Sequence, residues 1–390
     1  MATEYRGNAA EFIALIGAAR WQARLADLRQ MAGGSDRVGR ALAQRHAIEV
    51  ALERLRRGQP AGAVARMVEV GAGDAVALNA ALRRDGRKRF TAALRTALTG
   101  DGSLIALFHQ LAVAARERAR GFSVTFAGFA DGAPFDLAIT RGASTAEIAC
   151  DVVSAEEGRD VHRGAWVRLV DAVDPDLQTW LAQHPGRYLL KLTLNQGLKR
   201  EDASLPTMHD RIRTLLASSQ RTDQDAAAIL RLDPLMLAAA QANEAGMMPS
   251  LRREFGHEAH LAVMTGESGV CVLAARAGRE DDVANAIRRR MATIAPARLT
   301  GTKPGILAIL VEDTDAREWR HLRDQLEIEG AARQFLTEPE ARHVVAVSCM
   351  SRPELFEADP TPAAPELRFR NPGHPAAKST DLAAAILSLA

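Results

Sequence analysis

The spacing of apolar residues divides the chain into a helical first part and a longer part in which strands and helices alternate. Residues 9–31 place apolar side chains at nearly every third or fourth position, which is the spacing of one helical face. Similar runs continue to about residue 98, with breaks at Gly33-Gly34 and at Gly58-Gln59-Pro60. Because β-branched runs are absent here, we expect residues 1–100 to form a helical bundle.

The pattern changes after residue 100. Helices are expected at residues 103–120 and 159–182. The expected strands are residues 123–126, 135–140, 146–153 and 187–194. The turn residues Arg141-Gly142 leave only a short connection, so the second and third strands should pair antiparallel. The strand over 187–194 should lie beside the third strand in the same sheet.

The last part of the chain continues the alternation. Residues 205–245 show a helical pattern, and later segments alternate between strand and helix. Strands are expected at 259–264, 270–275, 305–311 and 343–349, and helices at 281–295 and 316–336. The sequence therefore predicts an α/β protein with a helical, net basic region (1–100), an α/β core (101–200) and a helical linker with an α/β extension (201–390).

Composition adds a charge asymmetry to this picture. The chain has 390 residues, 47% of them hydrophobic, and a formal net charge of only +2. The first 100 residues nevertheless hold 17 Lys and Arg against 9 Asp and Glu. Such a surplus is typical either of a nucleic-acid contact or of a solvated helical surface.

Two broad classes of protein are disfavoured. The three cysteines, Cys150, Cys271 and Cys349, are far apart and form no Cys-x-x-Cys pair, so neither a disulfide framework nor a zinc knuckle is indicated. The chain shows no signal-peptide pattern and no apolar run of membrane-spanning length. We therefore expect a soluble, cytoplasmic protein with no membrane partner.

Acidic residues gather on two of the expected strands. Strand alternation points Glu147, Ala149 and Asp151 to one face, and Asp136 opens the neighbouring strand. Converging carboxylates are what a hard divalent cation such as Mg²⁺ needs. In the alternative interpretation, Asp136 is a turn residue at a strand end and the other two acids face solvent.

This layout resembles the PD-(D/E)XK nuclease superfamily, in which a helix precedes a strand with Asp, a strand with (Asp/Glu)-x-Lys and a second helix. Asp136 matches the first acid, and Glu147-Ile148-Ala149 matches the second motif with alanine in place of lysine. The resemblance covers about residues 100–200 and implies a restriction-endonuclease-like core. It also implies catalytic roles for Asp136 and Glu147, Mg²⁺ at these acids and Asp151, and DNA as substrate.

If the chain is an active nuclease, another residue must take the role of the lysine that the family pattern has at position 149. Lys191, in the middle of the next expected strand, is one substitute, since a lysine can act from a neighbouring element. Without it, Ala149 supplies neither charge nor proton transfer.

Basic clusters supply candidate DNA contacts. Arg87, Lys88 and Arg89 belong to a run of five positive charges between residues 83 and 89, and would give salt-sensitive phosphate contacts. Arg159 and Arg163 are four apart near a helix start, so they are expected to share a face and to contact phosphate near the acids. The alternatives are a solvated turn for the first cluster and ordinary surface ion pairs for the second.

Three functional hypotheses follow. The first is a degenerate nuclease-like module that binds DNA without cutting it, which the missing lysine favours. The second is an active Mg²⁺-dependent DNA endonuclease with a relocated lysine. The third is a non-catalytic subunit that binds a protein partner or a second copy of itself. Glu312-Asp313-x-Asp315, at the end of an expected strand, suggests either a ligand site or, more simply, the cap of the next helix.

Overall fold

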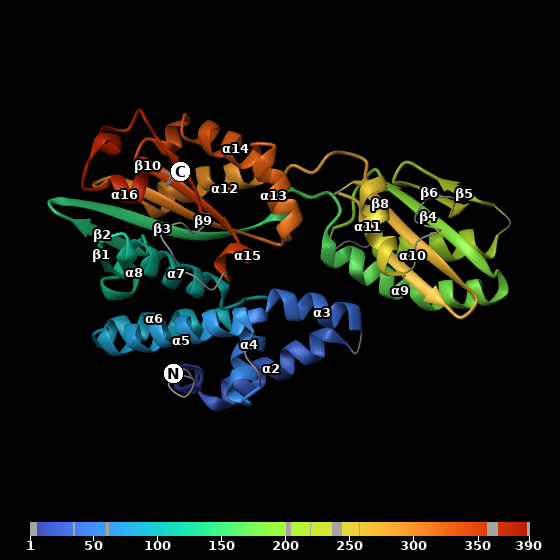
Figure 1. The fold of residues 1–390 in the computed structure, drawn as a ribbon, viewed down its shortest axis with the longest axis horizontal. Coiled ribbons are helices and arrows are strands. Elements are labelled where there is room, and N and C mark those ends of the chain that lie inside the picture. The colour runs from blue at the N-terminus through green and yellow to red at the C-terminus, as the bar shows by residue number, and fades with distance from the viewer. Residues whose placement is uncertain are drawn as a thin grey trace. The chain divides into compact units, whose positions relative to one another are not determined.

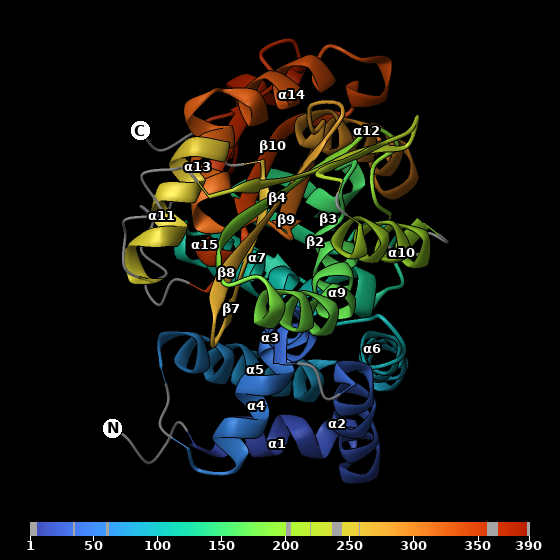
Figure 2. The same ribbon diagram turned by 90° about the vertical axis from the view of Figure 1, so that its right-hand side faces the viewer.

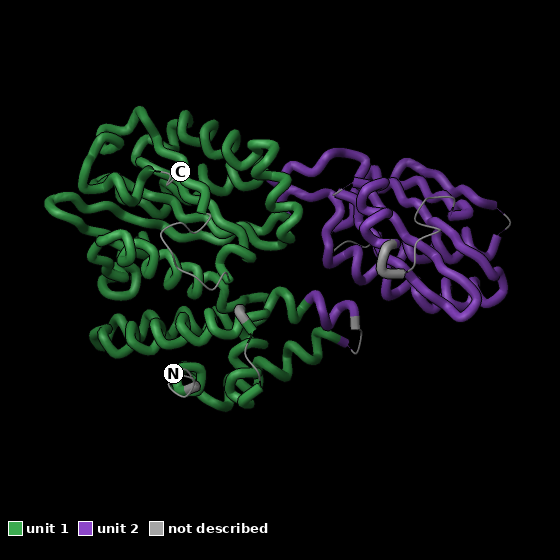
Figure 3. Tube along the Cα trace, in the orientation of Figure 1, with its two compact units in different colours: residues 1–32, 42–155, 284–390 green, residues 33–41, 156–283 purple. Residues whose placement is uncertain are grey.

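The chain consists of two compact units (Figure 3). Unit 1 comprises residues 1–32, 42–155 and 284–390, and unit 2 comprises residues 33–41 and 156–283. The computed structural model describes residues 6–33, 36–59, 62–199, 204–218, 220–235, 244–256, 258–356 and 366–387. Among these residues, no helix has the length and apolar character needed to cross a membrane.

The chain begins with helices, as the apolar spacing predicts. They are α1 (Arg6–Ile16), α2 (Ala18–Ala32), α3 (Asp36–Arg45), α4 (Ala47–Arg56), α5 (Ala63–Ala81) and α6 (Arg84–Ala97). The helix expected over 9–31 is interrupted at Gly17, whose φ of +93° lies in the left-handed region. Residues after the break at Gly58-Gln59-Pro60 form the single long helix α5.

The sheet of unit 1 has six strands (Figure 1). In spatial order they are β1 (Ser123–Thr125), β2 (Leu137–Arg141), β3 (Ser144–Ser154), β9 (Gly305–Glu312), β10 (Val344–Ser351) and β11 (Leu367–Arg370). Strands β1, β2 and β3 pair antiparallel, so the expected hairpin between β2 and β3 is confirmed. Strands β3, β9 and β10 pair parallel, and β11 closes the edge antiparallel to β10.

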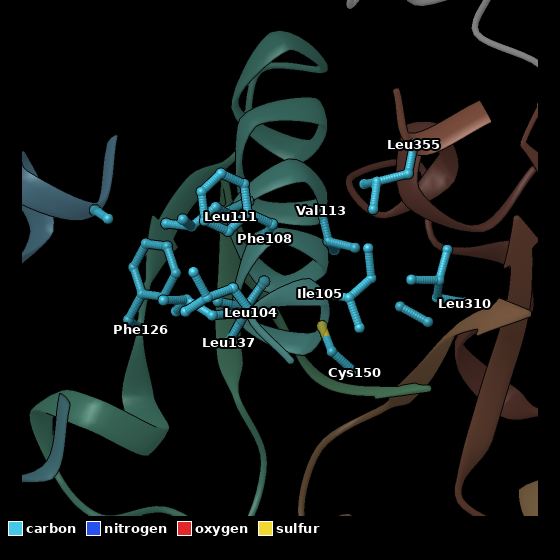
Figure 4. Close-up of a cluster of buried hydrophobic side chains, with 14 of the residues drawn as sticks. Leu104, Ile105, Phe108, Leu111, Val113, Phe126, Leu137, Cys150, Leu310 and Leu355 are labelled. Atoms are coloured by element: carbon cyan, nitrogen blue, oxygen red, sulfur yellow. The ribbon is translucent and has the colours of Figure 1, made fainter. Parts of the chain in front are cut away.

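Helices cover both faces of this sheet. One face packs on α7 (Ile105–Ala119), and Figure 1 shows α12 (Val283–Arg298) and α14 (Glu327–Phe335) on the opposite side. Figure 4 shows the apolar cluster at α7, which includes Leu104, Ile105, Phe108, Leu111, Leu137, Cys150 and Leu310. The buried cluster continues into α1, α4, α5 and α6, so these helices and the sheet share one core.

Unit 2 has a sheet of its own. Its strands, in spatial order, are β5 (Thr222–Gln224), β6 (Ala228–Pro234), β4 (Gly186–Leu194), β8 (Gly269–Ala277) and β7 (His260–Gly266). Among these described strands, β4 and β8 pair parallel and the other neighbours pair antiparallel. Helices α9 (Arg163–Gln183) and α10 (Ser204–Ala217) share a core with one face, and α11 (Glu244–Phe255) packs on the other (Figure 2).

Shorter elements complete the described part of the chain. They are α8 (Ala127–Ala130), α13 (Ala316–Asp324), α15 (Arg352–Leu355), α16 (Ala383–Ile386) and the 3₁₀ turns η1 (Ala155–Gly158), η3 (Pro339–Ala341) and η4 (Pro375–Lys378).

The expectation that the strand over 187–194 lies beside the strand over 146–153 is wrong. This segment is β4, which pairs with β6 and β8 in unit 2, whereas β3 pairs with β9. A parallel partner needs a crossover, and α12 supplies it instead of the helix next in sequence. Unit 2 is therefore inserted between β3 and α12, so the units divide the chain at different places from the expected boundaries at residues 100 and 200.

The helical prediction for residues 205–245 is only partly correct. Residues 204–217 form α10, but two antiparallel strands, β5 and β6, follow where helix was expected. The helix α11 begins at Glu244. Residues 236–243 lie outside the described part of the chain.

Candidate functional site

The three acids that the sequence analysis singled out lie on or beside two adjacent strands of the unit 1 sheet, β2 and β3. Glu147 and Asp151 belong to β3, with Ala149 between them. Asp136 stands just before β2, and its backbone N–H donates to the carbonyl of Ile148 at 3.0 Å. Asp136 therefore lies directly beside β3.

The carboxylate of Asp136 is fully engaged by neighbouring donors. Arg298 Nη2, from the last residue of α12, lies 2.8 Å from each of its oxygens. Gln110 Nε2 donates to Oδ1 at 2.9 Å, and the backbone N–H of Cys150 donates to Oδ2 at 2.7 Å. Burial raises the pKa of Asp136, and the Arg298 guanidinium opposes that rise. The Asp136 side chain is 11% exposed and that of Arg298 is 33% exposed, so the ion pair is partly buried.

Asp151 is paired in the same manner. Arg290 Nε and Nη2, also on α12, donate to its two oxygens at 2.5 and 3.0 Å, a bidentate arrangement. Arg290 and Arg298 are eight residues apart, slightly more than two helical turns. One side of the crossover helix therefore supplies a guanidinium to each aspartate.

Glu147 is held by a turn instead of an arginine. The backbone N–H of Thr300 donates to Oε2 at 2.9 Å, and its hydroxyl donates to Oε1 at 2.5 Å. The Thr302 hydroxyl lies 3.5 Å from the same Oε1. With only 3% of Glu147 exposed, the carboxylate fastens the turn before β9 to the motif strand.

The donor set does not fit a magnesium ion. Mg²⁺ requires carboxylate oxygens that are free to coordinate it together with several waters. Here the oxygens of Asp136 and Asp151 face arginines, and those of Glu147 face threonine donors. Among the described residues, no group of three or more His, Cys, Asp or Glu side chains is placed to hold a metal.

Position 149, where the nuclease pattern has lysine, leaves no room for a longer side chain. Ala149 is completely buried, opposite the equally buried Leu307 of β9. Lys191, the expected substitute, lies on β4 in the sheet of unit 2, whereas the three acids belong to unit 1. The expectation that Lys191 projects from the same sheet as the acids is wrong, because β4 and β3 never pair.

The basic cluster around residue 87 separates into three kinds of side chain. Arg87 is exposed on α6. Lys88 is also exposed and pairs with Asp85 at 2.9 Å. Arg89 donates from Nε to the Phe129 carbonyl at 2.8 Å and from Nη2 to the Ala130 carbonyl at 2.5 Å, so its guanidinium ties α6 to α8.

Arg159 and Arg163 do not share a helical face. The helix α9 begins only at Arg163, so Arg159 precedes it. Arg159 is 2% exposed and forms ion pairs with Glu156 and Asp281. Its expected role as a surface phosphate contact is therefore wrong, since the guanidinium is occupied inside unit 2.

A second polar cluster lies at the carboxyl ends of the parallel strands, where α/β sheets often bind ligands. Ser154 ends β3 and donates to Asp313 at 2.5 Å, and Asp313 has a left-handed backbone with φ of +60°. Glu312, at the end of β9, lies 3.8 Å from an Arg352 nitrogen. Asp315 caps α13 by accepting from two backbone N–H groups, so the capping interpretation is confirmed for this residue.

Glu312 makes unit 1 sensitive to pH. Burial raises its pKa from 4.5 to about 7, and Arg352 only partly opposes this. The folded state therefore binds more protons than the unfolded state between pH 4.5 and 7, and stability falls as the pH rises. We expect Glu312→Gln to be more stable than the wild type at pH 8 by about 2–3 kcal/mol, and equally stable at pH 4.5. Urea unfolding at both pH values measures this, and an unchanged pH dependence would contradict it.

Several residues of the acidic cluster escaped prediction from sequence. Arg290 was visible as part of a basic run, but its partner Asp151 is separated from it by all of unit 2. Arg298 lies beyond the expected end of its helix at residue 295. Gln110 and Thr300 carried no signal. Because the expected helix stopped at residue 295, the eight-residue spacing of Arg290 and Arg298 on one helix was not evident from the sequence.

No protein-family model, curated protein or solved structure matches this chain.

Proposed function

We propose that the protein is a non-catalytic, nuclease-like module that binds DNA. The observation that carries this proposal is that each of the three acids already has a partner within the protein. An arginine pairs with each aspartate, and threonine donors hold Glu147. Alanine stands where the nuclease pattern has lysine. A nuclease uses its acids to hold a cation that activates water and stabilises the charge of the transition state. In this chain the same acids stabilise the fold.

The order of elements in unit 1 supports the nuclease-like assignment. The family's layout is a helix, two strands that carry the acids, and a second helix. Unit 1 has these elements in the same order: α7, then β2, which begins directly after Asp136, then β3, which carries Glu147, and finally α12. The insertion of unit 2 separates the last helix from the first three elements without altering the sheet they build.

The DNA contact is proposed to be a basic stripe on α6, defined as Arg84, Arg87, Lys88 and Arg95. These positions lie within about 100° of one another around the helix. All four side chains are exposed, whereas Phe90 and Leu94 face the core. Cations near a helix N-terminus oppose the macrodipole, so most of the stripe costs helix stability. Phosphates would offset that cost and are favoured at this end of a helix.

The stripe makes a direct prediction about salt dependence. Replacing Arg84, Arg87 and Arg95 with alanine should weaken binding to duplex DNA by at least about tenfold at low salt. The slope of log K against log salt should flatten by about 2.7, because each lost phosphate contact removes about 0.9. Fluorescence anisotropy from 50 to 200 mM salt measures both quantities.

The matched control removes three exposed arginines elsewhere in unit 1, Arg317, Arg320 and Arg333. It should leave the slope unchanged. Equal slopes for the two triple variants would refute the stripe as the DNA contact. Mg²⁺-dependent cleavage by the wild-type protein that is lost in Asp136→Ala would support the active endonuclease instead.

A further inference from the structure

The sheet of unit 2 is covered unevenly. Helix α11 places Met247 and Leu251 against Leu189, Val270 and Val272, over β8 and the adjoining side of β4. Toward β6, the same face of the sheet carries exposed, charged side chains. Lys191 of β4 and Arg231 of β6 are both exposed, the latter side chain to 62%.

Three cations stand side by side on this face. Lys191 and Arg231 are direct partners across the antiparallel pairing of β4 and β6. Arg276 lies on the adjacent strand β8, on the same face, two residues beyond the partner of Lys191. Lys191 Nζ and the Arg276 guanidinium each lie 5.9 Å from the Phe255 ring centroid. We call Lys191, Arg231 and Arg276 the cation row.

The cation row is costly in the protein alone. Like charges directly opposite each other on neighbouring strands are destabilising. Asp233 pairs with Arg231 at 2.8 Å and offsets one of the three charges. Arg276 also donates to the Phe255 carbonyl, which orients its guanidinium without neutralising it. Among the residues that the structure describes, the row therefore retains an excess of positive charge on exposed side chains.

We propose that the cation row binds the phosphate backbone of a nucleic-acid strand. Strands are about 4.8 Å apart, so the row spans about 10 Å, the reach of two or three successive phosphates. Arginine forks bind phosphate oxygens bidentately, and an anion between Lys191 and Arg231 removes their repulsion. The Phe255 ring lies beside the row and offers an apolar surface on which a base or sugar can stack. The inference shares its ligand class with the proposed function but rests on unit 2 alone.

The test uses the full-length protein and a fluorescent single-stranded DNA of about 20 nucleotides. The double variant Lys191→Gln, Arg231→Gln should lose about tenfold in affinity at low salt. Its salt slope should flatten by about 1.4, since each single-strand contact contributes about 0.7. The variant should melt within about 2 °C of the wild type, because relief of the repulsion between Lys191 and Arg231 offsets loss of the exposed Arg231–Asp233 pair.

The control variant Arg213→Gln, Arg279→Gln removes two equally exposed cations of unit 2, each of which has one ion-pair partner. It should bind as the wild type does. Equal affinity and slope for the two double variants would overturn the inference, even if the α6 stripe variant had lost duplex binding. If polyglutamate of matched charge displaced the oligonucleotide as well as unlabelled DNA does, the occupant would be an acidic peptide, which also overturns it.

Discussion

Asp136→Ala should destabilise unit 1 by about 2–3 kcal/mol, which is less than the cost of breaking a fully buried ion pair because the Arg298 side chain is one-third exposed. The substitution leaves Arg298, Gln110 and the Cys150 N–H without their shared acceptor. A loss of 1 kcal/mol lowers the melting temperature of a domain of this size by about 2–4 °C, so the melting temperature of unit 1 should fall by at least about 4 °C. Calorimetry of the metal-free protein measures the shift.

The direction of this shift separates two interpretations of Asp136. In a metal site without its ion, clustered carboxylates repel one another, so loss of one would leave stability unchanged or raise it. Asp85→Ala is the matched control, since Asp85 pairs with Lys88 on the surface and exposed pairs contribute little. A melting temperature for Asp136→Ala at or above that of the control would refute the structural role proposed for the acid.

Ala149→Lys restores the (Asp/Glu)-x-Lys pattern and should nevertheless produce no nuclease. Ala149 has no exposed surface and packs beside Leu307, so a lysine stem overfills the space. Its ammonium would join a cluster in which arginines already balance the aspartates, and an unpaired buried charge is expensive. We expect a loss of more than about 3 kcal/mol and no Mg²⁺-dependent cleavage.

Ala149→Met separates the two causes, because methionine adds comparable volume without charge. It should cost about 1–3 kcal/mol, clearly less than the lysine variant. A folded Ala149→Lys protein that cuts DNA in the presence of Mg²⁺ would contradict the proposal, since it would show that only the lysine was missing.

Local patterns predicted most of the secondary structure. The hairpin of β2 and β3 followed from the short connection at Arg141-Gly142. The strand pattern at 305–311 was equally clear, but its pairing with β3 was not, because the partner lies more than 150 residues along the chain. Proximity in sequence favoured β4, the next long strand, as the partner of β3. Lys191 was therefore expected in the unit 1 sheet, although it lies in the sheet of unit 2.

The candidate site was predictable in its residues and not in its chemistry. Alternation places Glu147 and Asp151 on one face whatever covers them. What covers them depends on α12, which returns to unit 1 only after unit 2 has been completed. The sequence does not show whether a carboxylate faces water, a metal or an arginine. In the structure, Arg290 pairs with Asp151 and Arg298 pairs with Asp136.

The insertion of unit 2 also delays the pairing of β3 with β9 during synthesis of the chain. β3 emerges from the ribosome about 150 residues before β9, which at about 5–20 residues per second is a delay of about 8–30 s. Throughout that interval β3 has an unpaired edge and its apolar side chains lack their final cover, a state that favours aggregation. Unit 2 has nearly all of its chain available first, so the later domain in sequence can fold while the earlier one waits. Nascent chains halted between residues 283 and 305 should therefore be the species that chaperones hold longest.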